Sequence, residues 1–98
     1  MQVQMVENWS DLTGEVVAWH PSSPVAGFGI AEVKVRSTAP VGTFPDLLRD
    51  AVGETVRIYV PTAAAARLNL TPGATLRSRV RKAGPQSIFV HPEHVQTD

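Results

Sequence analysis

The chain has 98 residues, which is enough for one domain near the lower size limit for folding without cross-links. It contains no cysteine, which excludes disulfides and thiolate zinc sites, so the 43% of residues that are hydrophobic must supply a stabilising core. The net charge is zero, but residues 1–50 carry three basic and six acidic side chains, and residues 51–98 carry six basic and three acidic ones. This uneven distribution favours an anionic partner.

The beginning of the chain shows no sorting signal. Residues 1–12 include two acidic side chains and lack a basic stretch followed by an apolar one, so we expect no signal peptide. No apolar run approaches the roughly 20 residues that span a bilayer. These features predict a cytoplasmic protein with no membrane partner. We expect a single domain over residues 1–98, with a lead-in at 1–11 and a loose tail at 93–98.

Two strands are predicted in the first part of the chain. Residues 15–19 form a β-branched and aromatic run, and the prolines and serines that follow end it. Residues 30–36 alternate with a period of two, which indicates a half-buried strand. One face of this strand would carry Ile30, Glu32, Lys34 and Arg36, and the other would carry Ala31, Val33 and Val35.

Helical features follow in residues 44–53. Pro45 suits a first helical turn, Asp46 suits the positive end of the helix dipole, and Gly53 suits a C-terminal cap. We therefore expect a short helix over residues 44–52, of about two turns.

The second half of the chain is predicted to form three more strands and one short helix. Residues 54–60 alternate, with Arg57 and Tyr59 facing outward. Thr62 is a suitable N-cap for an alanine-rich helix at 63–68. Residues 74–83 alternate again, and residues 87–90 form a last short strand after a Gly-Pro turn.

Five short strands with a helix between the third and fourth predict a mainly β fold: a five-stranded OB-like barrel with one or two short helices. The helix at 44–52 would be an insertion between the second and third strands. Barrel closure also removes exposed sheet edges. An open β-sandwich and a swapped-hairpin dimer remain alternatives that the order of strands does not exclude.

A resemblance supports the barrel. Residues 60–76, Val-Pro-Thr-Ala-Ala-Ala-Ala-Arg-Leu-Asn-Leu-Thr-Pro-Gly-Ala-Thr-Leu, resemble the second half of molybdate-binding TOBE-type domains, which are OB-like barrels. Residues 12–17 resemble their first strand. The resemblance implies a small-oxyanion ligand, but the long second loop, the inserted helix and the alternating arginines depart from that pattern, and no oxyanion ligand set matches specific residues. The Leu-x-Pro-Gly turn is also similar to one in AbrB-like DNA-binding domains.

A stripe of arginines is the strongest candidate site. Arg77, Arg79 and Arg81 share one strand face, where like charges about 7 Å apart repel unless water, acidic neighbours or an anionic partner compensates them. We expect the outward faces of neighbouring strands to merge into one basic surface. It would bind phosphates and stack bases on its aromatic rings. The predicted site consists of Lys34, Arg36, Arg57, Tyr59, Arg77, Arg79 and Arg81, with Phe28 and Trp19 as further stacking platforms.

Each of these features has a simpler explanation. Charged strand faces are common because they are wet, and the arginines can pair with Glu15 or Glu32 across the sheet. Trp19 can pack in the core of a small barrel, and Phe28, between Gly27 and Gly29, can plug a barrel end.

Metal binding and catalysis are not indicated. Residues 91–94, His-Pro-Glu-His, hold three potential ligands, but their spacing fits no common zinc signature, and we expect a surface turn there without metal or cofactor. The chain lacks the Gly-x-Ser-x-Gly, Walker and His-Glu-x-x-His motifs. We therefore expect no enzyme.

The sequence thus predicts a non-catalytic module that binds single-stranded DNA or RNA, or another anionic polymer, through a basic strand face. The alternatives are a protein-interaction or assembly module, including a homo-oligomer, and a small-oxyanion binder of the TOBE type.

Overall fold

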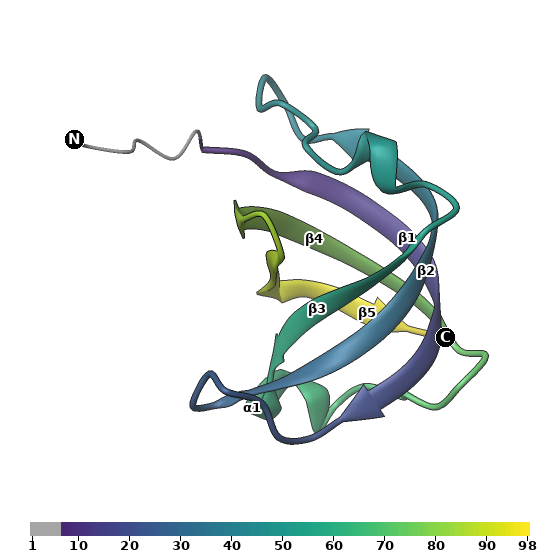
Figure 1. Cartoon of the computed structure of the whole chain (residues 1–98). Coiled ribbons are helices and arrows are strands. Elements are labelled where there is room, and N and C mark those ends of the chain that lie inside the picture. The colour runs from purple at the N-terminus through teal and green to yellow at the C-terminus, as the bar shows by residue number, and fades with distance from the viewer. Residues whose placement is uncertain (1–6) are drawn as a thin grey trace.

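The computed structural model describes residues 7–98, which form a closed barrel of five strands (Figure 1). The predicted mainly β fold, a five-stranded barrel with one or two short helices, is confirmed. The first six residues of the expected lead-in lie outside the described part of the chain. The elements are β1 (Ser10–His20), β2 (Phe28–Pro40), the 3-10 turn η1 (Arg49–Ala51), β3 (Thr55–Pro61), α1 (Thr62–Ala65), β4 (Thr75–Gly84) and β5 (Ser87–Thr97).

The order of strands around the barrel is β1-β2-β3-β5-β4, and β4 returns to pair with β1. All neighbouring strands are antiparallel except β3 and β5, which are parallel and joined only at Ile58–Ile88 and Tyr59–Phe89. Because the barrel closes within one chain, the alternative of an open sandwich is wrong. The order also separates β4 from β2 and β3, which decides which outward side chains can meet.

The core follows the period-two pattern of the strands. Val33 and Val35 of β2, Ile58 and Val60 of β3, and Leu76 of β4 are at most 1% exposed, while the residues between them face outward. Each such side chain contributes roughly 1.5–3 kcal/mol by leaving water. The loops add further apolar side chains to this core, among them Leu48 and Leu70.

The helix predicted at residues 44–52 is wrong, since only the single turn η1 forms there. The Asp46 carboxylate instead accepts hydrogen bonds from the Ser10 hydroxyl (2.7 Å), the Thr38 hydroxyl (2.8 Å) and the backbone N–H of Leu48 (3.0 Å). A side chain that bonds the backbone two residues later favours a turn over a helix. The β2–β3 loop, residues 41–54, is thereby attached to β1 and β2.

These contacts also change the acidity of Asp46. Partial burial raises the pKa, but the hydrogen bonds from the two hydroxyls and the Leu48 N–H, with the nearby charge of Arg49, outweigh burial and lower the pKa below its ordinary 3.8. The charged carboxylate is therefore the form that holds the loop.

The helix α1 forms where predicted but has only four residues. Pro61, not Thr62, occupies the N-cap position, and the Thr62 hydroxyl instead donates a hydrogen bond to the carbonyl of Gly27 at 3.3 Å. The predicted N-cap is therefore wrong. Thr62 attaches α1 to the β1–β2 loop, residues 21–27, and the two lie together at one end of the barrel (Figure 1). No helix within residues 7–98 combines the length and apolar character needed to cross a bilayer.

Both ends of the described chain are more ordered than the sequence predicts. β1 begins at Ser10, and before it the buried Asn8 side chain donates to the Lys82 carbonyl (2.9 Å) and accepts from the Lys82 N–H (2.8 Å). The tail predicted to be loose at 93–98 belongs largely to β5, which pairs Val95 and Thr97 with β4. The prediction missed this pairing because a proline such as Pro92 is typical of a strand end.

Candidate functional site

Three aromatic rings from different strands meet on the outside of the barrel. Tyr59 of β3 and Phe89 of β5 are stacked, with centroids 4.9 Å apart and planes inclined by 19°. Phe28, the first residue of β2, meets Phe89 edge-on at 5.5 Å. All three are partly exposed. Together with the outward Arg57 and Arg81 they form what we call the aromatic face.

The barrel topology creates this cluster. Tyr59 lies between the buried Ile58 and Val60, so it must point outward, and the parallel pairing places Phe89 directly beside it. The β4–β5 register then places Arg81 opposite Phe89, with its guanidinium carbon 6.0 Å from the ring centroid. This is the geometry of a cation–π contact.

Phe89 is absent from the residues that sequence analysis singled out. The alternation of Ile88, Phe89 and Val90 predicts that its ring faces outward, and this signal was present in the sequence. What the sequence does not reveal is that β5 lies next to β3, because that pairing depends on barrel closure.

Arg57, Arg81 and Lys34 keep their charges available. Among residues 7–98, none of the three lies within ion-pair distance of a carboxylate. Arg57 and Lys34 are exposed on β3 and β2, and Arg57 lies two positions from Tyr59 on the same strand face. Arg57 and Arg81 thus lie beside the stacked rings, and Lys34, opposite Thr55, lies further along the same sheet face.

A groove of about 570 Å³ adjoins these side chains. It is located where β3 and β5 are joined by only two residue pairs, so that the β4–β5 turn stands away from β3. Arg57, Tyr59 and Ile30 line one side, and residues 85–87 line the other. The groove offers a ring, a cation and the polar groups of Gln86 and Ser87 to a ligand.

The β1–β2 loop holds Phe28 in place. The Ser23 hydroxyl donates to the carbonyl of Phe28 at 2.7 Å and accepts from the Val25 N–H at 3.1 Å, and the Thr62 N–H donates to the carbonyl of Gly27 at 3.0 Å. Gly27 has a positive φ of 83°, which a residue with a side chain adopts only under strain. The β1–β2 loop is therefore fixed beside the aromatic face, and the β4–β5 turn lines the groove on its other side.

The continuous basic surface predicted from the sequence is wrong. Arg36 is paired with Glu15 at 2.8 Å, Arg77 with Asp98 at 2.9 Å, and Arg79 with Asp11 at 3.0 Å. β4 lies between β5 and β1, so the arginine stripe does not join the outward face of β2. The simpler explanation, charge pairing across the sheet, holds for Arg36 and Glu15. We call the outer surface that carries these three ion pairs the paired side.

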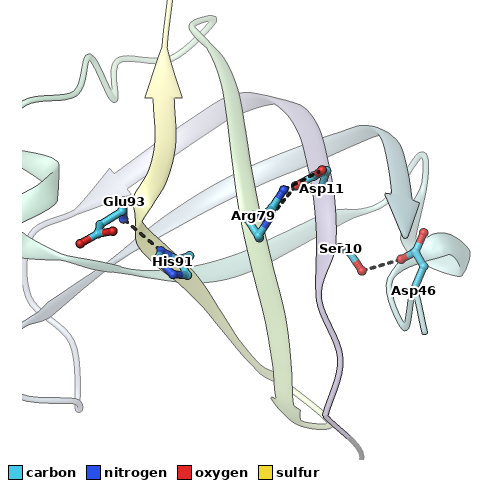
Figure 2. A network of polar contacts seen from close by, with 6 residues as sticks. All are labelled: Ser10, Asp11, Asp46, Arg79, His91 and Glu93. Carbon is cyan, nitrogen blue, oxygen red and sulfur yellow. Dashed lines mark hydrogen bonds and ion pairs between the residues drawn. The ribbon is translucent and has the colours of Figure 1, made fainter. Parts of the chain in front are cut away.

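A second groove, of about 420 Å³, lies over β4 on the paired side. Figure 2 shows Arg79 reaching Asp11 across the β1–β4 pairing. In this region β5 leaves the regular register, so that residues 91–94 lie opposite Arg79 alone. The cations of this groove are paired, and the groove also contains Asp11 and Glu93, which repel an anion.

The predicted turn at residues 91–94 is instead an irregular part of β5. The Glu93 N–H donates to His91 Nδ1 at 3.1 Å, a contact drawn in Figure 2. The rings of His91 and His94 lie 4.7 Å apart. In the described part of the chain, no group of three or more histidine or acidic side chains is arranged to hold a metal ion.

The outward position considered for Trp19 is wrong. The register of β1 and β2 shifts between Val16 and Ala18, which leaves Val17 45% exposed and reverses the facing of the residues that follow. Trp19 therefore packs against the core, and its ring lies over Gly29, where a Cβ atom would be 2.3 Å from the indole. Core packing, the alternative weighed from the sequence, is confirmed.

Comparison of the chain with protein-family models, with curated proteins and with solved structures finds no match. Only the chemistry of the aromatic face therefore indicates a function for this barrel.

Proposed function

We propose that this protein is a non-catalytic module that binds single-stranded nucleic acid on the aromatic face. The observation that carries the proposal is the stacked Tyr59–Phe89 pair with Arg57 and Arg81 beside it and a groove along it. Single-strand binding requires rings that meet bases and cations that follow phosphates. The paired side offers no such combination.

The position of this face also supports the proposal. OB-fold proteins bind oligonucleotides on their second and third strands and on the loops β1–β2 and β4–β5. In this barrel, Phe28 and Tyr59 lie on β2 and β3, and the same two connections flank them. The likeness is one of architecture, and the ligand is inferred from the side chains.

The proposed contacts divide into two kinds. Arg57, Arg81 and Lys34 would bind phosphates, which fixes the path of the strand without reading its sequence. Phe28 and Tyr59 would contact bases, and every base has a flat apolar face, so sequence preference should be weak. Phe89 is contacted by Tyr59 and by Arg81, so it mainly supports its neighbours.

Fluorescence anisotropy of a labelled oligothymidine of about 12 nucleotides tests this function. Three phosphate contacts give a slope of about −2 in a plot of log affinity against log salt, so affinity should fall about 20-fold between roughly 50 and 200 mM salt. No binding at the lower salt concentration would refute the proposal.

The alternatives make different predictions in the same samples. An assembly module would form a defined oligomer in native mass spectrometry and leave the oligonucleotide free. A small-oxyanion binder would gain thermal stability from molybdate or tungstate but not from the oligonucleotide.

A further inference from the structure

We propose that His20 keeps the Glu32 carboxylate away from Arg57, and thereby keeps a phosphate-binding arginine available on the aromatic face. The inference rests on the proposed function. It assigns His20 and Glu32 as positioning residues that regulate the affinity of that face.

The sheet register makes Glu32 the natural partner of Arg57. The two residues are directly opposite each other on β2 and β3, and both point outward. Opposite residues in an antiparallel pair have Cβ atoms about 5 Å apart, and opposite charges in this position attract. A Glu32–Arg57 ion pair is therefore the arrangement expected from the strands alone.

The structure has a different arrangement. Glu32 Oε2 lies 2.6 Å from His20 Nε2, on the side of β2 away from β3. With its proton on Nε2, the imidazole donates this hydrogen bond to the carboxylate. Arg57 then has no carboxylate partner within residues 7–98.

The other arginines near carboxylates show what happens without such a competitor. Arg79 lies opposite Asp11 in the β1–β4 register and is paired with it. Arg36 forms an ion pair with Glu15 on the adjacent strand. Arg57 also lies opposite a carboxylate, that of Glu32, but forms no ion pair with it. The difference is that Glu32 is hydrogen-bonded to His20.

Release of Glu32 would weaken phosphate binding. A carboxylate paired with Arg57 neutralises the guanidinium and must be displaced before a phosphate can bind there. Exposed ion pairs are weak, so the expected effect is modest, about threefold in affinity. The effect should also depend on Glu32 being charged, which makes the inference testable by a double-mutant cycle.

The cycle compares the wild type with His20→Ala, Glu32→Gln and the double variant in oligothymidine binding. His20→Ala should weaken binding about threefold, because it frees Glu32 to pair with Arg57. Glu32→Gln should bind at least as tightly as the wild type. The double variant should match Glu32→Gln, since without the carboxylate His20 has nothing to hold.

Two further variants serve as controls. His20→Gln keeps an N–H donor that can reach Glu32 and should restore most of the affinity lost in His20→Ala. Glu54→Gln removes one exposed negative charge from a side chain with no hydrogen bond or ion pair in the described structure, and should leave the effect of His20→Ala unchanged.

A second measurement does not depend on nucleic acid. In NMR spectra, the Arg57 Nε–H signal should shift in His20→Ala as the new ion pair forms, and it should return to its wild-type position in the double variant. If wild type fails to bind oligothymidine, the proposed function is wrong, and the NMR comparison still decides where Glu32 lies. Equal weakening by His20→Ala with and without the Glu32 charge, or an unmoved Arg57 signal, would overturn the inference.

Discussion

The two outward surfaces of this barrel both carry arginines, but they differ in how the charges of those arginines are satisfied. On the paired side, Arg36, Arg77 and Arg79 each contact a carboxylate within 3.0 Å. On the aromatic face, Arg57 and Arg81 have no such partner within residues 7–98, and Arg81 lies over the ring of Phe89. The number of arginines on a strand is thus a poor guide to a binding surface, because the neighbouring strand decides which of them remain free.

The largest expected effect comes from removing a ring. Tyr59→Ala should weaken oligothymidine binding about 5- to 150-fold, because stacking on an aromatic ring contributes roughly 1–3 kcal/mol per base. Phe44→Ala, which removes a partly exposed ring from the β2–β3 loop, is the matched control and should bind normally. Equal losses in both variants would mean that the aromatic face is not special.

A direct comparison of the two surfaces gives the next effect. The double variant Arg57→Ala/Arg81→Ala should lower affinity about tenfold. It should also reduce the slope of log affinity against log salt by about 1.4. Arg77→Ala/Arg79→Ala removes the same charge from the paired side and should change affinity less than about twofold. Anisotropy titrations at several salt concentrations check both variants. A larger loss of affinity in Arg77→Ala/Arg79→Ala than in Arg57→Ala/Arg81→Ala would place binding on the paired side.

A substitution at Asp46 should change the stability of the protein without changing its affinity for the oligonucleotide, because the loop of Asp46 belongs to neither surface. Asp46→Asn should lower the free energy of unfolding by about 1 kcal/mol at neutral pH, since it replaces a charged acceptor of three hydrogen bonds. Because the pKa of Asp46 is below 3.8 in the folded protein, this stabilisation is complete above that value and is lost as the pH falls through the folded-state pKa.

Urea unfolding at neutral pH and at a pH of about 3 or below therefore should show the difference between wild type and Asp46→Asn shrink in acid. Asp50→Asn, on the same loop and without a side-chain partner in the described structure, is the control and should behave as wild type at both pH values. Oligothymidine affinity at neutral pH should be unchanged in both variants.

The smallest expected effect tests whether an ion pair alone prevents an arginine from binding the oligonucleotide. Asp11→Asn frees Arg79, which lies on the same strand face as Arg81, and should raise affinity about twofold. The gain should disappear in Asp11→Asn/Arg79→Ala. If the gain persists without Arg79, it reflects only the loss of a negative charge.

The local pattern was sufficient to predict the strands and their faces. Alternation around Ile58 and Val33 correctly predicted that Arg57, Tyr59 and Lys34 lie on the outside, and five such strands predicted the barrel. These features follow from the period of a strand, which depends only on neighbouring residues.

The errors arose where a distant residue decides the outcome. Asp46 bonds Ser10 from 36 positions away, which replaces the predicted helix by a turn. The pairing of Arg79 with Asp11 depends on the β1–β4 register across 68 positions. The outward position considered for Trp19 was wrong for a local reason. The register shift between Val16 and Ala18 lies in an apolar run, where alternation gives no sign of it.

Closure of the barrel between β1 and β4 also bears on how the chain is made. Residues as far apart as Ser10 and Val80 must pair, and Asn8 must reach the backbone of Lys82. During translation the first two strands can form a hairpin early, but the other edge of β1 stays uncovered until most of the polypeptide has left the ribosome. Such an edge invites pairing with other chains, so the late arrival of β4 sets the period in which a nascent molecule is most exposed to aggregation.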